Sequence, residues 1–337
     1  MRVFITGGAG YIGSHAAVAM LEGGHEVTVL DNYANSSADV LRKVEEITGK
    51  KCSVYQEDIT DASKLDALMT KIRPHSVLHF AGRKSVAESV ERPDFYHQQN
   101  VVGTRNLLSS MAKCGCTQII FSSSATVYGT PEKLPLNETH RVSPFNPYGA
   151  SKLAAEKEIA AWTDVAPERS AVLLRYFNPI GAHLSGKIGE NPKGRPNNLF
   201  PFITQVAVGQ RAELEIYGDD YDTPDGTGVR DYIHITDLVD GHIAALHYAQ
   251  NHKGSEIFNL GTGKGYSVCE MLHTFEAVTG RRVPYCIKGR RPGDIAACYA
   301  DTAKAKNELG WIAKFGLEQM CRDGWRYQEN QSNNRKK

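Results

Sequence analysis

Short apolar runs alternate with helical patterns over roughly the first half of the chain. Six runs have the length and composition of buried strands, and they cover residues 2–6, 26–30, 53–56, 76–80, 118–121 and 171–176. The stretches between them that show helical spacing cover residues 14–21, 63–72, 101–113 and 147–162. Because strands that alternate with helices pack as parallel βαβ units, the pattern predicts an α/β fold. We expect a doubly wound parallel sheet with right-handed crossovers.

The alternation weakens after about residue 178, where glycine and proline become frequent. Short strand patterns remain at 213–217 and 257–260, together with a helical pattern at 235–250. The length of 337 residues and a usual domain size of ~150 residues suggest two domains. We expect the doubly wound domain at 1–178 and a smaller C-terminal lobe at 179–337, with some segments that return to the main sheet. The tail, 333–337, is expected to be frayed.

Composition and charge are those of an ordinary soluble protein. Hydrophobic residues make up 41% of the chain, and 39 lysines and arginines nearly balance 38 acidic residues. The net charge of +1 gives no overall attraction to nucleic acid or to an anionic membrane, so we expect neither as a partner. No apolar run approaches the length of a membrane span, and Met1 leads almost directly into the first strand, so we expect no signal peptide.

The seven cysteines favour free thiols in a reducing cytoplasm, because their number is odd and none forms a C-x-x-C pair. The segment Cys114-Gly115-Cys116 has neither zinc nor redox spacing. Lone histidines such as His79 and His234 have no partner at metal spacing, so we expect them to be structural and expect no metal site.

A glycine-rich turn follows the first predicted strand. The segment Gly7-Gly8-Ala9-Gly10-Tyr11-Ile12-Gly13 leads into a helix, and Asp31 ends the next strand. This context is that of a dinucleotide-binding motif, in which glycines and a helix N-terminus let the backbone approach a pyrophosphate. Asp31 would accept hydrogen bonds from the adenosine ribose and repel a 2′-phosphate, which favours NAD over NADP. Taken alone, the same aspartate fits an ordinary loop.

Tyr148 and Lys152 stand one turn apart on a predicted helix. Asn146 is a good N-cap and Pro147 suits the first helical position. The same helix face continues through apolar side chains at positions 155, 159 and 162, so it points into the fold. A phenol, with a pKa of ~10, can act as a base near neutral pH when a nearby ammonium favours its anion. The alternative is a buried tyrosine beside a lysine that reaches solvent.

Several motifs together resemble a known family. The segments 6–13, 122–129 and 148–152 resemble those of the extended short-chain dehydrogenases/reductases, and 174–179, 225–234 and 290–294 resemble the UDP-glucose (UDP-galactose) 4-epimerase branch. They occur in order and span nearly the whole chain. The resemblance implies a Rossmann-type domain that binds NAD, a UDP-sugar substrate held mainly by the second lobe, and a cytoplasmic homodimer in galactose and carbohydrate metabolism. It implies an isomerase that oxidises the sugar transiently to a 4-keto form.

The resemblance also implies roles for individual residues. Tyr148 would be the base on the sugar 4-hydroxyl, Lys152 would lower its pKa and hold the nicotinamide ribose, and Ser124 would hydrogen-bond the 4-oxygen. The residues implied to bind NAD are Gly7, Gly10, Tyr11, Ile12, Gly13, Asp31, Asn32, Asn35, Ser36, Asp58, Ile59, Phe80, Ala81, Gly82, Lys84, Tyr148, Lys152 and Phe177. The residues implied to bind the UDP-sugar are Lys84, Ser124, Tyr148, Asn178, Asn198, Leu199, Glu215, Ile216, Tyr217, Arg230, Arg291, Asp294 and Cys298.

The chain departs from the family pattern at Cys298. Many epimerases of this kind have a tyrosine there, three residues before the acid that is Asp301 here. In the family this position bounds the sugar pocket, and a small side chain admits a 2-N-acetyl group. We therefore expect activity on UDP-N-acetylglucosamine and UDP-N-acetylgalactosamine as well as on the plain sugars. A small buried cysteine without such a role is the alternative. Gln99 and Asn100, where relatives often carry paired asparagines, are left out of the site.

Three other functions compete with this one. A nucleotide-sugar 4,6-dehydratase would carry an Asp-Glu pair where this chain has Ala125-Thr126, so elimination lacks its acid–base groups. A non-catalytic protein on the same fold would be expected to lack Tyr148, Lys152 or the arginines, and all are present. An epimerase that prefers uronic acids or N-acetylated sugars remains open, because no motif excludes it.

Overall fold

The computed structural model describes residues 1–194, 196–291 and 293–335. Its largest feature is a seven-stranded sheet whose strand pairs are all parallel, in the order β10-β6-β5-β4-β1-β2-β3. The strands are β1 (Arg2–Thr6), β2 (Glu26–Leu30), β3 (Ser53–Tyr55), β4 (Ser76–His79), β5 (Gln118–Ser122), β6 (Ser170–Tyr176) and β10 (Gly254–Leu260). The α/β class and the doubly wound parallel sheet predicted from the sequence are confirmed.

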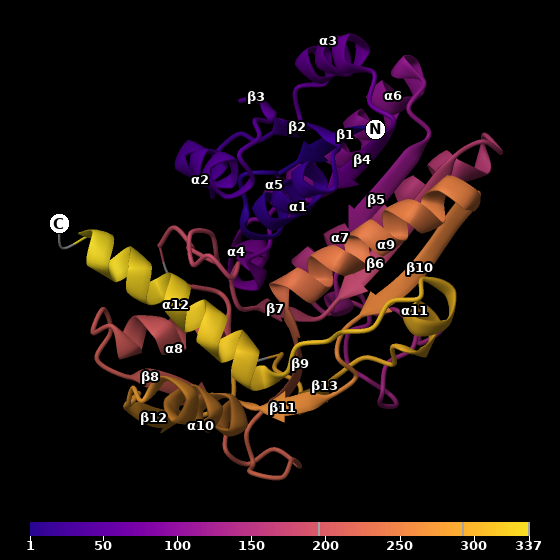
Figure 1. Cartoon of the computed structure of the whole chain (residues 1–337). Coiled ribbons are helices and arrows are strands. Elements are labelled where there is room, and N and C mark those ends of the chain that lie inside the picture. Colours follow the sequence, from indigo (N-terminus) through magenta and orange to yellow (C-terminus); the bar gives the residue numbers. More distant parts are fainter. Residues whose placement is uncertain (195, 292, 336–337) are drawn as a thin grey trace.

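Helices cover both faces of this sheet, which explains why the strands read as short continuous apolar runs. One core packs against α1 (Tyr11–Glu22), α2 (Ala38–Thr48) and α9 (Ile235–Asn251). The other packs against α3 (Ala62–Ile72), α6 (Gly103–Cys114) and α7 (Pro147–Asp164). In Figure 1, α9 crosses in front of the strands and α7 lies behind them. The central strands are therefore buried on both sides, so ligands can reach them only at the ends of the strands.

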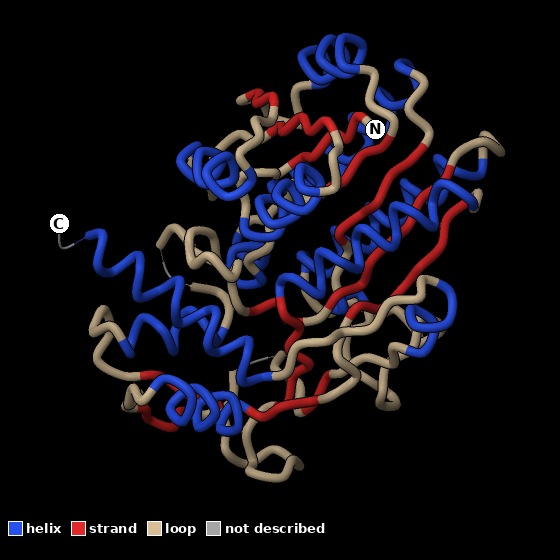
Figure 2. Tube along the Cα trace, viewed as in Figure 1, coloured by secondary structure: helices blue, strands red, loops and turns tan. Residues whose placement is uncertain are grey.

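A smaller lobe faces the carboxyl ends of the large sheet. Strand β7 (Asn178–Ile180) continues from β6 and pairs with β9 (Val229–His234), which also pairs with β11 (Gly265–Ser267) and β13 (Ala297–Cys298). A second, two-stranded sheet joins β8 (Leu214–Tyr217) to β12 (Tyr285–Lys288). Figure 2 shows the contrast between the long strands of the large sheet and the short strands and extended loops of this lobe.

Three helices build the core of the small lobe. They are α8 (Leu199–Ala207), α10 (Val268–Thr279) and α12 (Leu317–Arg335), and they meet around buried side chains that include Ile203, Phe275 and Met320. Helix α12 runs to Arg335, so residues 333–335 of the tail that was expected to be frayed are helical, and residues 336–337 lie outside the described residues. Strand β10 belongs to the second half of the sequence but pairs with β6 at the edge of the large sheet.

Five short elements complete the chain. On the α7 side, α4 (Val86–Glu91), α5 (Pro93–Tyr96) and a π-helical turn η1 (His97–Val102) lead into α6. A 3₁₀ turn, η2 (Ala125–Val127), follows β5, and α11 (Ala303–Glu308) follows β13. The strand order reverses between β1 and β4, which is where open α/β sheets bind ligands. The loops after β1, β4 and β5 therefore frame the candidate site.

Candidate active site

The glycine-rich turn after β1 is built for close backbone approach. Gly7 has φ +71°, and a Cβ there would lie 2.7 Å from the Ala81 nitrogen in the neighbouring loop. A Cβ on Gly13 would lie 2.2 Å from the Gly7 oxygen, so only glycine lets α1 pack against the turn. The N-cap of α1 is Gly10, and no side chain caps the helix or places an acid in its first turn. Its N–H groups and positive end are thus available to a phosphate.

Two aspartates organise the loops on the β2 side of this turn. Asp31 accepts hydrogen bonds from the Ala9 nitrogen (2.9 Å), the Tyr33 nitrogen (2.8 Å) and the Ser36 hydroxyl (2.7 Å). Asp58 accepts one from the Asn32 amide at 2.7 Å. Burial opposes ionisation of Asp58, but hydrogen bonds from its neighbours outweigh it and hold its pKa below the usual range. Both carboxylates are therefore fixed acceptors suited to ribose hydroxyls and base amino groups.

Two other residues on this side differ in exposure. Asn35 is exposed at the loop surface. The Ile59 side chain lies in the core, where a Cβ on Gly103 would touch it, so any ligand contact at Ile59 would be through its backbone.

The loop after β4 is tied to the helices behind it by Asn100. This buried residue of the π-helical turn accepts from the Arg83 nitrogen (2.7 Å) and donates to the Arg83 oxygen (3.0 Å) and the Ser151 hydroxyl (2.9 Å). A Cβ on Gly82 would lie 2.9 Å from the Asn100 oxygen and 3.7 Å from the Lys152 nitrogen. Asn100 thus positions Gly82 against Lys152. It was left out of the predicted site, and its place in a π-helical turn is not visible in the sequence.

Helix α7 begins as the sequence predicts and buries its two functional side chains. The Asn146 side chain accepts from the Gly149 nitrogen at 2.8 Å, and Pro147 takes the first turn. Tyr148 is 7% exposed and Lys152 is 5% exposed. The Lys152 ammonium donates to the Ser122 carbonyl at 2.8 Å and lies 4.8 Å from the centre of the Phe121 ring. The alternative of a lysine that reaches solvent is therefore excluded.

The acid–base properties of this pair follow from burial and one hydrogen bond. Burial raises the pKa of Tyr148 above its ordinary value, and a hydrogen bond with Ser124 offsets only part of this rise. Burial lowers the pKa of Lys152 to about 8, against the charge of Glu156, which raises it. In this structure the group that favours the Tyr148 phenolate is therefore Ser124, whereas Lys152 is directed to the Ser122 carbonyl.

A buried ion pair anchors α7 beneath this site. The Arg175 guanidinium lies 2.6 Å from the Glu156 carboxylate, with side chains 4% and 5% exposed. The Ser123 hydroxyl donates to the same carboxylate, and Arg175 stacks over the Tyr128 ring at 4.9 Å. The strand-end serine Ser123 thus has a structural role that its sequence context did not reveal.

Comparison with known proteins identifies the family. A model of the GDP-mannose 4,6 dehydratase family matches residues 4–324. A UDP-glucose 4-epimerase of Bacillus subtilis is 52% identical over 99% of this chain and 98% of its own length. The mouse UDP-glucose 4-epimerase is 49% identical over 97% and 96%. The chain belongs to the UDP-glucose 4-epimerase family.

Solved epimerase structures share the fold over almost every residue. The Stenotrophomonas maltophila epimerase, with bound NAD and formylated UDP-arabinopyranose, has a TM-score of 0.97 at 46% identity and covers 99% of both chains. The Bifidobacterium longum epimerase, in complex with NAD+ and UDP, has a TM-score of 0.95 at 48% identity and the same coverage. The fold prediction and the family resemblance are thereby confirmed.

Several of the residues predicted to bind the UDP-sugar lie in the small lobe. Arg291 forms an ion pair with Asp294 at 2.8 Å and stacks over the Tyr217 ring at 4.7 Å. Arg230 donates to the carbonyls of Val229 and Ile295. The motif 290–294 also contains Pro292, which lies outside the described residues.

Other predicted substrate residues occupy different positions. The Tyr217 hydroxyl donates to Glu215, and Leu199 begins α8. Phe177, predicted to bind NAD, is buried in the cluster that contains Ala125. The Ile216 side chain belongs to the small-lobe core, so only its backbone can face a ligand.

Cys298 ends the short strand β13 of this lobe. It is partly buried, stands opposite Arg230 in the β13–β9 pair, and packs on a cluster that contains Phe177 and Ala125. Burial raises the pKa of its thiol to about 11, so the side chain is a small neutral group. A surface hollow of about 710 Å³ is lined by residues that include Ala297, Asp294 and Leu134, but not by Cys298.

A segment of the small lobe crosses the front of the cofactor-side loops; we call residues 181–194 and 196–198 the bridging segment. The Tyr11 hydroxyl donates to Gly181, and Lys193 donates to the Tyr33 carbonyl at 3.0 Å. Glu190 accepts from both Lys84 and Asn198 at 2.8 Å. Glu190 was missed from the sequence because it stands in a glycine- and proline-rich stretch with no motif.

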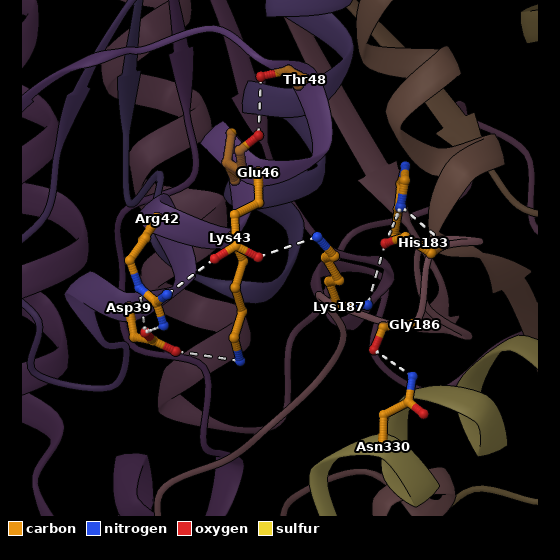
Figure 3. Close-up of polar contacts among 11 residues, drawn as sticks. Asp39, Arg42, Lys43, Glu46, Thr48, His183, Gly186, Lys187 and Asn330 are labelled. Carbon is orange, nitrogen blue, oxygen red and sulfur yellow. Dashed lines mark hydrogen bonds and ion pairs between the residues drawn. The ribbon is translucent and has the colours of Figure 1, made fainter. Parts of the chain in front are cut away.

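Further contacts fix this segment to helices of both lobes. Lys187 pairs with Glu46 of α2 at 3.1 Å, and Asn330 of α12 donates to Gly186 (Figure 3). Figure 3 also shows that these contacts come from opposite sides of the segment. The bridging segment therefore connects α2, the β4–α4 loop and α12.

Other chemistry is absent from the described part of the chain. There, no cluster of three or more histidine, cysteine or acidic side chains could hold a metal ion. The same residues contain no helix that is both long and apolar enough to cross a bilayer. The seven cysteines are all free thiols.

Proposed function

We propose that this chain is an NAD-dependent isomerase that interconverts UDP-glucose and UDP-galactose by inverting C4 through a transient 4-keto sugar. The observation that carries the proposal is the burial of Tyr148 beside Ser124 and Lys152 at the carboxyl edge of a sheet whose neighbouring turn fits a dinucleotide. The identity of about 50% to UDP-glucose 4-epimerases over nearly the full chain supports it.

The residues fit NAD on three counts. The uncapped N-terminus of α1 and the tight glycine turn suit its pyrophosphate, and Asp31 and Asp58 suit its adenosine half. Residues 80–84 would then meet the nicotinamide half. When bound, NAD supplies hydride acceptance and return at the sugar C4. We propose that residues 1–178 bind NAD and that residues 179–337 mainly bind the UDP-sugar.

The chain's own groups move the proton. Tyr148 takes the 4-hydroxyl proton as the sugar is oxidised and returns it after the keto sugar has presented its other face. Ser124 holds the 4-oxygen in both directions, and Lys152 holds the nicotinamide ribose. Arg230 and Arg291 carry the charge to grip the diphosphate, with Asp294 as acceptor for the uridine ribose. Tight binding of UDP and weak binding of the sugar allow the keto sugar to rotate and present its other face.

Isotope retention tests this mechanism. UDP-galactose that carries deuterium at C4 should yield UDP-glucose that keeps the deuterium, because the same hydride leaves and returns. NAD should be released when the purified protein is denatured. Loss of the label to water would contradict the proposal, as would a stable 4-keto-6-deoxy product, which would indicate a dehydratase. The latter is disfavoured because Ala125 and Thr126 offer no carboxylate.

We also propose that the enzyme accepts UDP-N-acetylglucosamine and UDP-N-acetylgalactosamine. The small, neutral Cys298, where many members of the family have a tyrosine, supports this wider pocket. The relative turnover of UDP-galactose and UDP-N-acetylgalactosamine tests it. Turnover of the first without the second would contradict it.

Finally, we propose a cytoplasmic homodimer. The family resemblance supports the dimer, and seven unpaired thiols support a reducing compartment. Light scattering on the purified protein should give about twice the chain mass of 37.1 kDa. A monomer over the working concentration range would contradict the dimer.

A further inference from the structure

The hydroxyl of Ser124 has both of its acceptor positions filled by a single residue. The Thr126 backbone nitrogen donates to Ser124 Oγ at 3.2 Å, and the Thr126 hydroxyl donates to the same oxygen at 3.0 Å. A serine hydroxyl carries one hydrogen to donate and two lone pairs to accept. With both lone pairs engaged, Ser124 can act toward any further group only as a donor.

In the free enzyme the neighbouring acceptor is the Tyr148 phenol. Burial raises the Tyr148 pKa and Ser124 opposes that rise, which is the effect of a donor to the phenolate. The other titratable groups near Tyr148 are Lys152 on the same helix, bonded to the Ser122 carbonyl, and Tyr176 of β6. Helix α4 contacts Tyr148 through Ser89, while its Glu88 is bonded to Tyr96, and η2 carries no titratable side chain.

Packing fixes Thr126 relative to the helix that carries Tyr148. A Cβ on Gly149 would lie 2.8 Å from the Thr126 oxygen, so the first turn of α7 rests directly on this peptide. Val127 and Tyr128, which follow Thr126, are fully buried. The separation of Ser124 and Tyr148 is therefore set by the same turn that fills the Ser124 lone pairs.

We propose that Thr126 is a positioning residue whose hydroxyl commits Ser124 to hydrogen-bond donation, and so directs the sugar's 4-hydroxyl proton to Tyr148. A serine with a free lone pair can accept the sugar O4–H, which leaves that proton pointing away from the base. With its lone pairs filled, Ser124 can only donate, so when the sugar binds its one hydrogen passes from Tyr148 to O4, and O4–H is left with Tyr148 as its acceptor. This inference rests on the proposed epimerase function.

The test compares Thr126→Val with Thr126→Ser in the full-length enzyme. Valine keeps the shape but removes the hydroxyl, whereas serine keeps the donor. For Thr126→Val we expect kcat on UDP-galactose to fall about five- to tenfold with KM nearly unchanged. We also expect the acid limb of the kcat/KM–pH profile, which reports the free enzyme, to move up by roughly 0.5–1 unit, because Tyr148 then loses a committed donor. Thr126→Ser should restore both values to near wild type.

Controls separate this inference from the proposed function. Thr139→Val makes the same substitution at an exposed site and should leave both readouts unchanged. An inactive wild-type enzyme would refute the epimerase function itself. If the wild type is active and Thr126→Val keeps its kcat and pH profile, the positioning role is overturned. A loss that serine does not rescue also overturns it, because it indicates a packing effect. If the valine variant does not fold, Thr126→Ala replaces it under the same criteria.

Discussion

Lys152 shows how burial sets the character of a single side chain. Its ammonium lies in the protein interior, bonded to the Ser122 carbonyl, and its pKa falls to about 8. A lysine whose folded pKa lies below its unfolded value makes the protonated folded state less stable. This destabilisation weakens as pH rises from about 8 to the ordinary lysine pKa of 10.5, because the folded protein then binds fewer protons than the unfolded chain.

We therefore expect Lys152→Met to stabilise the protein while it abolishes most activity. Methionine keeps the volume and removes a buried charge, which should raise the free energy of unfolding at pH 7 by about 1–2 kcal/mol. Thermal unfolding at pH 7 and pH 10 measures the effect, and the gain should shrink at the higher pH. An equal or lower Tm at pH 7 would show that the ammonium is not a net cost to folding.

The size of the side chain at position 298 is expected to set which sugars the enzyme accepts. Cys298→Tyr would place a large ring in the proposed wall of the sugar pocket, so turnover of UDP-N-acetylgalactosamine should fall roughly tenfold or more relative to UDP-galactose. Competition assays on both substrates give the ratio. Cys286→Ser, at a partly exposed cysteine of β12, is a matched control. An unchanged ratio in Cys298→Tyr would remove this residue from the pocket wall.

Among the elements, α7 depends on the pair Glu156–Arg175. Arg175→Met leaves a buried carboxylate without its cation, which should cost about 3–5 kcal/mol of stability. Replacement of both partners by apolar residues should recover much of that loss, because neither charge is then left alone. Chemical denaturation of the two single variants and the double variant tests this. Equal losses in Arg175→Met and the double variant would show that the pair itself is not what stabilises the helix.

Some of the strands and helices could be predicted from the sequence and others could not. Strands β1, β2, β4, β5 and β6 were predicted to within a few residues because each is an apolar run buried on both faces, and β3 was predicted although its side chains are exposed or only partly buried. Helix α2 was missed although Ser37 caps it and Gly49 ends it in the left-handed region. Helix α12 was missed because its apolar residues, such as Met320, are diluted by a polar sequence and gain meaning only against α8 and α10.

The candidate site divides in the same way. Tyr148, Lys152 and the glycine turn were found because local spacing defines them. Asn100 and Glu190 were not found, because their partners lie at positions 83, 151, 84 and 198, and only the tertiary fold brings these together.

At the scale of the whole molecule, buried histidines make stability depend on pH. Burial lowers the pKa of His15 and His79 to about 3 and that of His242 to about 4. Below pH 6.5 the unfolded chain takes up protons at these sites while the folded protein does not. Stability is therefore lost as pH falls from about 6.5 toward 4, by about 2 kcal/mol per histidine between pH 7 and 5.

We expect His15→Gln to flatten this dependence. His15 on α1 lies 6.3 Å, ring to ring, from His183 of the bridging segment, so its protonation would strain the contact between the lobes. The drop in unfolding free energy between pH 7 and 5 should be about 2 kcal/mol smaller in the variant. His247→Gln, at an exposed position of α9, is the comparison. Parallel curves for wild type and His15→Gln would contradict the assignment.

The contacts of the bridging segment affect how the enzyme would retain its dinucleotide. Its contacts with Tyr11, Tyr33 and Lys84 lie on both sides of the crevice between β1 and β4. A dinucleotide seated there could exchange with the surroundings only after those contacts opened together. Because inversion leaves the nicotinamide in its starting oxidation state, no exchange is needed between catalytic cycles. The fold is thus suited to keeping one dinucleotide molecule as a resident part through many turnovers, independent of the cell's balance of oxidised and reduced forms.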